Sequence, residues 1–293
     1  MSFKSDMRSF LLTHPRFNPY KFSFDYTFRL LTSPLRHLPH FLIIGTSKAG
    51  KHSVLSYLNQ HPEIKSGTKH NVGVYFFDVT FESKSISWYK SHFPTKFSKF
   101  KIIGEASGTY LNHPFAPQRI KKILPHVKLV NFFRNPVDRA YSAYNHSFKL
   151  GWDHSTFDNS IKSEINRIEM MKDFPETKID NIHSVNFLQF SYLRHGHYAS
   201  NLKNWLKIFP QKQFKHFSTE ELDENYNKIM NSLFSFFNLK EINLNKEERK
   251  NIGIGKGKYP PMKESTRDML IDYFKPHNEE LYSLINKKFD WDK

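Results

Sequence analysis

Short apolar runs alternate with amphipathic segments along most of the chain. Residues 41–44 form an unbroken apolar run that ends at Gly45, which is typical of a strand buried on both faces. Residues 101–103 and 127–133 predict two further buried strands. Each run is followed by a loop and a segment with helical character, which is the alternation expected of a parallel sheet. The pattern therefore predicts an α/β fold of three layers, with a parallel central sheet flanked by helices.

Three segments carry apolar residues at helical spacing, namely residues 53–60, 191–209 and 266–284. No run approaches the roughly 20 apolar residues that a transmembrane helix needs. The chain shows no internal repeat and no long flexible linker, so we expect one domain over residues 39–293. Residues 1–38 are basic and aromatic and lack a signal-peptide cleavage site. They are predicted to form an arm packed on this domain, with a peripheral membrane contact as the alternative.

The composition excludes some kinds of site but does not identify the binding partner. The 293 residues carry a net charge of +16, which calls for an anionic partner such as nucleic acid, an anionic membrane, an anionic polysaccharide or a polyphosphate ligand. The chain has no cysteine, which excludes disulfides, thiolate metal sites and cysteine nucleophiles. A chain without cysteine suits a reducing compartment, so we expect a cytoplasmic location, with membrane association as the alternative.

A glycine- and lysine-rich loop follows the first predicted strand. Residues 45–51 fit the pattern GxxxxGK, in which backbone amides and a helix N-terminus bind phosphate. The hydroxyl that would hold Mg²⁺ directly after the lysine is replaced by His52 and displaced to Ser53. The loop therefore favours a phosphate ligand bound without magnesium, and no metal site is predicted.

A second anion site is predicted at the end of the strand at residues 127–133. This strand delivers Arg134 to the carboxyl edge of the sheet, where open α/β folds bind ligands. Asn135 is suited to cap the following helix, on which Arg139 and Ser142 lie three residues apart. Arginine and a hydroxyl on one face suit a phosphate dianion; alternatively, Arg139 pairs with a local carboxylate and Ser142 is a surface residue.

The order of these motifs resembles the sulfotransferases that use PAPS, 3′-phosphoadenosine 5′-phosphosulfate. The most similar are the heparan sulfate N- and 3-O-sulfotransferases and their bacterial relatives. The likeness covers roughly residues 40–291, and its segments are residues 42–50, 59–64, 104–111, 134–144, 196–210, 255–262 and 266–281. No nucleic acid partner is expected on this resemblance.

The resemblance implies a site for each phosphate of the donor. Lys48 would contact the phosphosulfate, whereas Arg134 and Ser142 would bind the adenosine 3′-phosphate. The residues implied to wrap the 5′-phosphate are Ala49, Gly50, Lys51, His52 and Ser53. The loop implied to close over PAPS includes Lys256, Gly257, Lys258 and Tyr259. The chain departs from the family pattern at Lys51 and His52, which still favour phosphate by their charge.

The implied reaction moves the sulfuryl group of PAPS to a hydroxyl or amine of an acceptor, expected to be a carbohydrate, and releases PAP, the desulfated nucleotide. Lys48 is the candidate that stabilises the leaving oxygen. The resembled enzymes keep a glutamate base between a His-Pro pair and a Phe-Phe pair, and this chain has none there. Counting forward places His70 at that position, and counting back places Gly73; Glu105 and Glu82 are the alternative bases.

Two other functions stay open. A P-loop kinase of small molecules would use ATP and Mg²⁺. A non-catalytic anion-binding protein of the sulfotransferase fold would explain the missing glutamate as lost chemistry.

Overall fold

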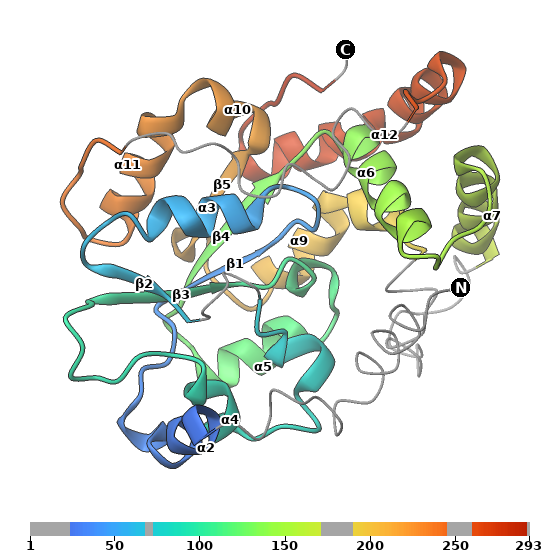
Figure 1. The fold of residues 1–293 in the computed structure, drawn as a ribbon. Helices are drawn as coiled ribbons and strands as arrows, with labels where there is room; N and C mark the ends of the chain where they lie inside the picture. Colours follow the sequence, from blue (N-terminus) through green and yellow to red (C-terminus); the bar gives the residue numbers. More distant parts are fainter. Residues whose placement is uncertain (1–23, 68–72, 171–189, 245–259, 292–293) are drawn as a thin grey trace.

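The computed structural model describes residues 24–67, 73–170, 190–244 and 260–291, and every structural statement below concerns these residues. A five-stranded parallel sheet lies at the centre, in the order β2-β3-β1-β4-β5 (Figure 1). Its strands are β1 (Phe41–Gly45), β2 (Ile64–Ser66), β3 (Ile102–Ala106), β4 (Lys128–Phe133) and β5 (Phe214–Ser218). Because β3 and β4 lie on opposite sides of β1, the carboxyl end of β1 is a topological switch point.

Helices cover both faces of the sheet, which confirms the predicted three-layer α/β fold. The helices are α2 (Phe24–Leu31), α3 (Lys51–Leu58), α4 (Ile86–Ser91), α5 (Ala116–Ile123), α6 (Pro136–Lys149), α7 (Phe157–Met170), α9 (Tyr198–Leu206), α10 (Thr219–Glu224), α11 (Tyr226–Phe236) and α12 (Glu264–Ile285). The short helical turns are η3 (Ser33–Leu35), η4 (Phe76–Thr80), η5 (Tyr110–Asn112), η7 (Arg194–Gly196) and η8 (Gln211–Gln213).

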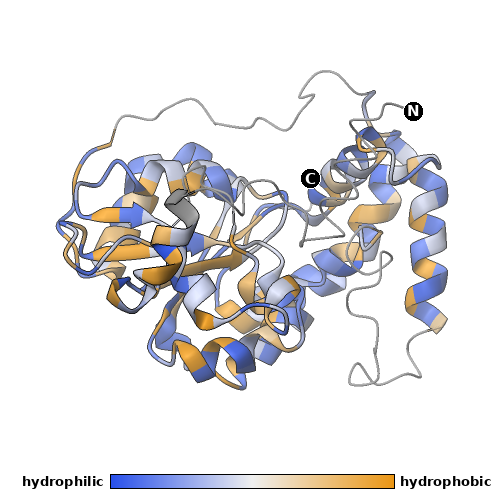
Figure 2. Ribbon diagram, turned by 60° about the horizontal axis from the view of Figure 1, so that its bottom comes forward, coloured by the Kyte–Doolittle hydropathy of each residue, from blue (hydrophilic) through white to orange (hydrophobic). Residues whose placement is uncertain are grey.

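Strand β1 sends alternate side chains into two separate cores. Leu42 and Ile44 pack with residues of α4, α5, α9 and α12 on one face. Phe41 and Ile43 pack with residues of α3, α10 and α11 on the other. A third cluster joins α6, α7 and α12 beside the sheet. Hydrophobic residues accordingly fill the strands and the inner faces of the helices, as Figure 2 shows.

The predicted helix at residues 191–209 is shorter than expected. It begins at Tyr198 as α9, and η7 precedes it. The backbone of Gly196 lies against the ring of Phe274 on α12, where an added Cβ would come within 2.7 Å of the ring. The apolar residues before α9 therefore pack as a turn against α12 rather than as a continuous helix.

Candidate active site

The glycine- and lysine-rich loop joins β1 to α3 at the carboxyl edge of the sheet. Two of its residues, Lys48 and Gly50, have left-handed backbone conformations, with φ of 71° and 69°. The second is the N-cap of α3, so the amides of the first helical turn end at this loop. The amide of Thr46 donates to the carbonyl of Phe132 at 2.8 Å, which ties the loop to β4. The loop thus has the geometry of an anion-binding turn.

Arg134 brings the two predicted phosphate sites together. It follows β4 directly, and its guanidinium donates to the backbone carbonyl of Lys48 at 3.0 Å. The next residue, Asn135, caps α6 as predicted by accepting from the amide of Val137 at 3.0 Å. The ends of neighbouring strands β1 and β4 therefore place a lysine loop and an arginine side by side at the switch point.

Lys48, Lys51 and Arg134 form what we call the cation cluster. Burial, together with the charges of Arg134 and Arg139, lowers the pKa of Lys48 to about 8. Burial and the charge of Lys48 likewise lower the pKa of Lys51 to about 8, and Asp78 opposes part of this shift. In the part of the chain that the structure describes, none of the three forms an ion pair with a carboxylate within 4.0 Å. Such a cluster favours binding of an anion.

Arg139 does not join this cluster as a ligand-binding group. Its side chain is fully buried and donates to the backbone carbonyl of Tyr192. The nearby carboxylate of Glu164 stabilises its charge. The structure therefore favours the alternative for Arg139, in which it lies near a local carboxylate and packs toward the core. Ser142 is half-buried on the same helix, and its role stays a prediction.

The other predicted donor residues of the first loop lie at the start of α3. Ala49 and Ser53 are buried, Gly50 is exposed and His52 is half-buried. The displaced hydroxyl of Ser53 thus sits inside the first turn of α3, one residue beyond the P-loop position.

Glu105, at the end of β3, is a buried carboxylate with a full set of hydrogen-bond donors. One oxygen accepts from the hydroxyls of Tyr89 and Tyr110, each at 2.9 Å. The other accepts from the amide of Val74 at 3.0 Å and the hydroxyl of Ser107 at 3.3 Å. Burial nevertheless raises the pKa of Glu105 to about 7. Four donors match the roughly four lone-pair sites of a carboxylate.

The same network holds the segment that follows the predicted base. The hydroxyl of Tyr110 accepts from the amide of Phe76 at 2.9 Å, and that of Ser107 accepts from the amide of Tyr75 at 3.0 Å. His70 itself lies outside the described residues. The remaining alternative, Glu82, is exposed and pairs with Arg119 at 2.9 Å, at the surface.

Asp78 is a buried acidic residue that the sequence analysis did not single out. One oxygen accepts from the amide of Val79 at 2.6 Å, and the other accepts from the hydroxyl of Thr109. Burial raises the pKa of its carboxyl, and its charge acts on Lys51. Its position directly after the Phe-Phe pair was the signal that could have identified it.

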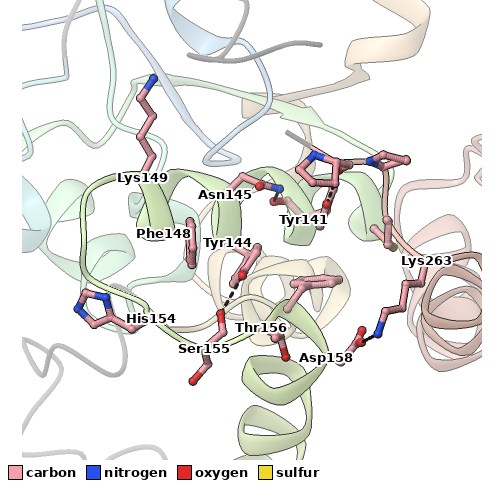
Figure 3. Close-up of a pocket in the computed structure, with 14 residues that line it drawn as sticks. Tyr141, Tyr144, Asn145, Phe148, Lys149, His154, Ser155, Thr156, Asp158 and Lys263 are labelled. Carbon is pink, nitrogen blue, oxygen red and sulfur yellow. Dashed lines mark hydrogen bonds and ion pairs between the residues drawn. The ribbon is translucent and has the colours of Figure 1, made fainter. Parts of the chain in front are cut away.

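The predicted closing loop, Lys256 to Tyr259, lies outside the described residues, but the chain that follows it is firmly attached. The hydroxyl of Tyr141 on α6 donates to the carbonyl of Pro260 at 2.6 Å. Asp158 on α7 accepts from Lys263 at 2.6 Å, as Figure 3 shows. It also accepts from Thr266 at 2.7 Å. Residues 260–266 are thus tied to both α6 and α7.

A cavity of about 880 Å³ opens beside these contacts. Aromatic side chains from α6 and from the first turn of α7, among them Tyr144, Phe148 and Phe157, face it, and residues 260–263 close one side (Figure 3). None of the described residues predicted to bind the donor lines it. Part of its wall is instead formed by residues 260–263, which follow the predicted closing loop in the sequence.

Within the described segments, no three histidine or acidic side chains are grouped as metal ligands. No helix in those segments is long and apolar enough to cross a membrane.

A parallel sheet with a cationic loop at its switch point defines a nucleotide- or phosphate-binding class of α/β protein. The family described as "Sulfotransferase domain" matches residues 38–266, so the chain belongs to this family. The predicted family resemblance is thereby confirmed. The residues assigned to binding and catalysis stay predictions.

Two relatives illustrate the range of the family. The chain is 24% identical to the membrane-associated sulfotransferase kil1 of Dictyostelium discoideum, over 87% of this chain and 66% of that protein. It is 28% identical to the bifunctional heparan sulfate N-deacetylase/N-sulfotransferase 1 of Caenorhabditis elegans, over 86% of this chain and 30% of that protein. The chain thus spans less than two thirds of both relatives, and about a third of the second.

The solved structure of a sulfotransferase from Alicyclobacillus acidocaldarius has the same fold. It superposes with a TM-score of 0.71 at 24% identity, covering 88% of this chain and all of the other.

Proposed function

We propose that this protein transfers a sulfuryl group from PAPS to a hydroxyl or amine of a carbohydrate. The observation that carries the proposal is the hydrogen bond from Arg134 to the carbonyl of Lys48, which joins two predicted phosphate sites at one sheet edge. Membership of the sulfotransferase family and the heparan sulfate acceptor named for several relatives support the same reaction. The net charge of +16 suits an anionic saccharide as well as the donor.

The donor would lie across the carboxyl ends of β1 and β4. Lys48 and the amides at the start of α3 would hold the 5′-phosphosulfate, and Arg134 with Ser142 would hold the 3′-phosphate. Residues 256–259 would close over the nucleotide. Pro260, the next residue in the sequence, accepts a hydrogen bond from Tyr141.

The reaction is a displacement at sulfur. An oxygen or nitrogen of the acceptor forms a bond to sulfur while the bond from sulfur to the bridging oxygen of the 5′-phosphate breaks. PAP leaves with that electron pair, and the acceptor proton passes to a base. Lys48 would stabilise the charge that develops on the leaving oxygen, and the loop would align the reacting groups.

For the base we propose His70, with Glu105 as a positioning residue. Glu105 already accepts four hydrogen bonds, so taking a proton from an acceptor would require one of them to break. Its partners instead hold residues 74–77, which lead back toward His70. Asp78 is the second candidate, because it accepts two hydrogen bonds and retains acceptor capacity near Lys51.

The donor assignment is tested by thermal unfolding of the full chain with PAP, and separately with ATP and Mg²⁺. PAP at a hundredfold excess over its dissociation constant, without divalent metal, should add about 2.7 kcal/mol to the free energy of unfolding. Stabilisation by ATP only with Mg²⁺, and none by PAP, would favour the kinase. Binding of PAP without any transfer to a panel of saccharides would favour the non-catalytic alternative.

An arginine variant adds a second arm to this experiment. Arg134→Ala should weaken PAP by roughly 1.5–3 kcal/mol, because a charge-assisted phosphate contact is lost. Adenosine 5′-phosphosulfate, which lacks the 3′-phosphate, is the control ligand and should lose much less. Equal losses for both nucleotides would mean that Arg134 only supports the loop through the carbonyl of Lys48.

A further inference from the structure

An apolar stripe faces solvent on the segment that precedes β1. Phe28 and Leu31 on α2 and Leu35 in η3 follow one another at a spacing of three and four residues, and all are exposed. This spacing puts side chains on one side of a helical segment. Apolar residues on one side of an amphipathic helix ordinarily face the protein core, whereas Leu31 is 76% exposed.

A second exposed aromatic residue lies beside this stripe. Residues 36 and 95 form an antiparallel bridge, and the amide of Lys96 donates to the carbonyl of Leu35 at 2.8 Å. The chain then turns, with the amide of Ser98 donating to the carbonyl of Thr95 at 3.0 Å. Phe97 stands in this turn and is 82% exposed. We call Phe28, Leu31, Leu35 and Phe97 the apolar patch; they are four of the ten large hydrophobic residues exposed in the described structure.

Lysines border the apolar patch. Lys96 lies in the turn itself and is close enough to His37 to lower its pKa, although burial of His37 is the larger cause. Lys99 and Lys65 are both exposed, and each places its ammonium within 6 Å of the Phe100 ring centre. Exposed large apolar side chains with lysines on one side of them are an arrangement that binds an anionic lipid surface.

The apolar patch lies away from the cation cluster. Its residues 28–35 precede the amino end of β1 and Phe97 precedes that of β3, whereas the loop at residues 45–50 follows the carboxyl end of β1. Figure 1 shows α2 and α4 together at one end of the molecule, with α7 on a different side. A surface bound at α2 would therefore leave the carboxyl edge of the sheet open to donor and acceptor.

We propose that the apolar patch and its lysines dock the protein on an anionic membrane surface. Phe28, Leu31 and Phe97 would enter the interface between head groups and acyl chains, while Lys96 and Lys99 would pair with lipid phosphates. The binding is peripheral and reversible, and it depends on salt through the lysines.

The experiment is co-sedimentation of the full chain with vesicles of phosphatidylcholine, with and without phosphatidylserine. The wild-type protein should partition onto the vesicles that contain phosphatidylserine and much less onto phosphatidylcholine alone. The double variant Leu31→Glu with Phe97→Glu should lower the partition coefficient at least tenfold, since it replaces two apolar side chains that would be buried in the lipid by charged ones. Lys96→Glu with Lys99→Glu should lower it at low salt, and this loss should shrink at 1 M salt.

Met170→Glu is the matched control, because Met170 at the end of α7 is 74% exposed and therefore as accessible as Leu31. It should bind vesicles as the wild type does. PAP stabilisation and the unfolding temperature of each variant verify that it is folded. Unchanged binding of the Leu31 and Phe97 variant, or an equal loss in the Met170 variant, would overturn the proposal. So would a wild-type dimer that this double variant converts to a monomer, which would make the patch a contact between two copies.

Discussion

The cation cluster and Glu105 are charged groups at the carboxyl ends of neighbouring strands, but the protein compensates their charges differently. Lys51 and Glu105 are buried, whereas Lys48 and Arg134 are half-buried. Lys48 is repelled by Arg134 and repels Lys51, and within the described chain no carboxylate forms an ion pair with the three, although the charge of Asp78 acts on Lys51. Glu105 instead accepts four hydrogen bonds from the protein. A charge left without a counter-charge lowers stability and is suited to bind a ligand, whereas a saturated charge organises structure.

The largest effect is expected from His70→Ala, which tests whether the saturated carboxylate is indeed excluded as the base. The rate of sulfuryl transfer should fall about 10²–10⁴-fold with PAP affinity nearly unchanged, because a general base is lost. The rate of the wild type should fall in acid with an apparent pKa nearer the histidine value of about 6.5 than the glutamate value of about 4.3.

The transfer rate of Asp78→Asn is measured together with that of His70→Ala, since both side chains are candidates for the base that accepts the acceptor proton. Near-normal turnover in the histidine variant and loss in the asparagine variant would transfer the role to Asp78.

Next in size is the effect of Glu105→Ala on stability. Removing the shared acceptor leaves the Tyr89 and Tyr110 hydroxyls and the Val74 amide without a partner, so unfolding should become easier by about 2–4 kcal/mol. Chemical denaturation measures this directly. If Glu105 contributed only by filling space, Glu105→Gln and Glu105→Leu would both lower the free energy of unfolding by the same small amount.

The pH profile of the Glu105→Gln variant gives a second measurement. The pKa of Glu105 is raised from 4.5 to about 7 in the fold, so the folded state binds more protons than the unfolded state between these values. Its contribution to stability is fully present below pH 4.5 and is lost as the pH rises through about 7. The variant should lack this decline.

The smallest expected effect, of roughly 1–2 kcal/mol, is a gain in stability for Lys51→Met at pH 7. The variant removes a buried charge that Lys48 repels, and it should bind PAP more weakly. The pKa of Lys51 is lowered from 10.5 to about 8, so the penalty is fully present below pH 8 and vanishes as the pH rises toward 10.5. Lys122→Met, at an exposed position on α5, is the control and should change neither property.

The sequence predicted the middle of the sheet better than its edges. Strands β1, β3 and β4 are almost entirely buried, and each contains at least two consecutive large apolar residues, which is the pattern that the sequence shows. Strand β2 has three residues and β5 contains a lysine and a histidine, because each pairs with only one neighbour. Such strands are short or polar, so periodicity does not distinguish them from loops.

The sequence likewise predicted some residues of the candidate site and not others. Local patterns placed Lys48 and Arg134 at strand ends, and the structure brings them into contact. Spacing along a helix tells which residues share a face, but not which face is buried, so the sequence left open whether Arg139 faces the ligand or the core. The saturation of Glu105 depends on Tyr89, which is 16 residues away and carries no local signal.

The bond between Arg134 and the Lys48 carbonyl shows that the two predicted anion sites follow neighbouring strands, so the spacing of those strands sets the distance between them. Parallel neighbours are held about 4.8 Å apart by backbone hydrogen bonds, and this spacing does not depend on loop conformation. The two predicted anion sites lie at the ends of β1 and β4, so the pairing of these strands sets the distance between the backbone positions that carry them. A ligand with two charged groups would then be selected by the length between them. Segments outside β1 and β4 could then change in evolution without changing the distance between the two predicted anion sites.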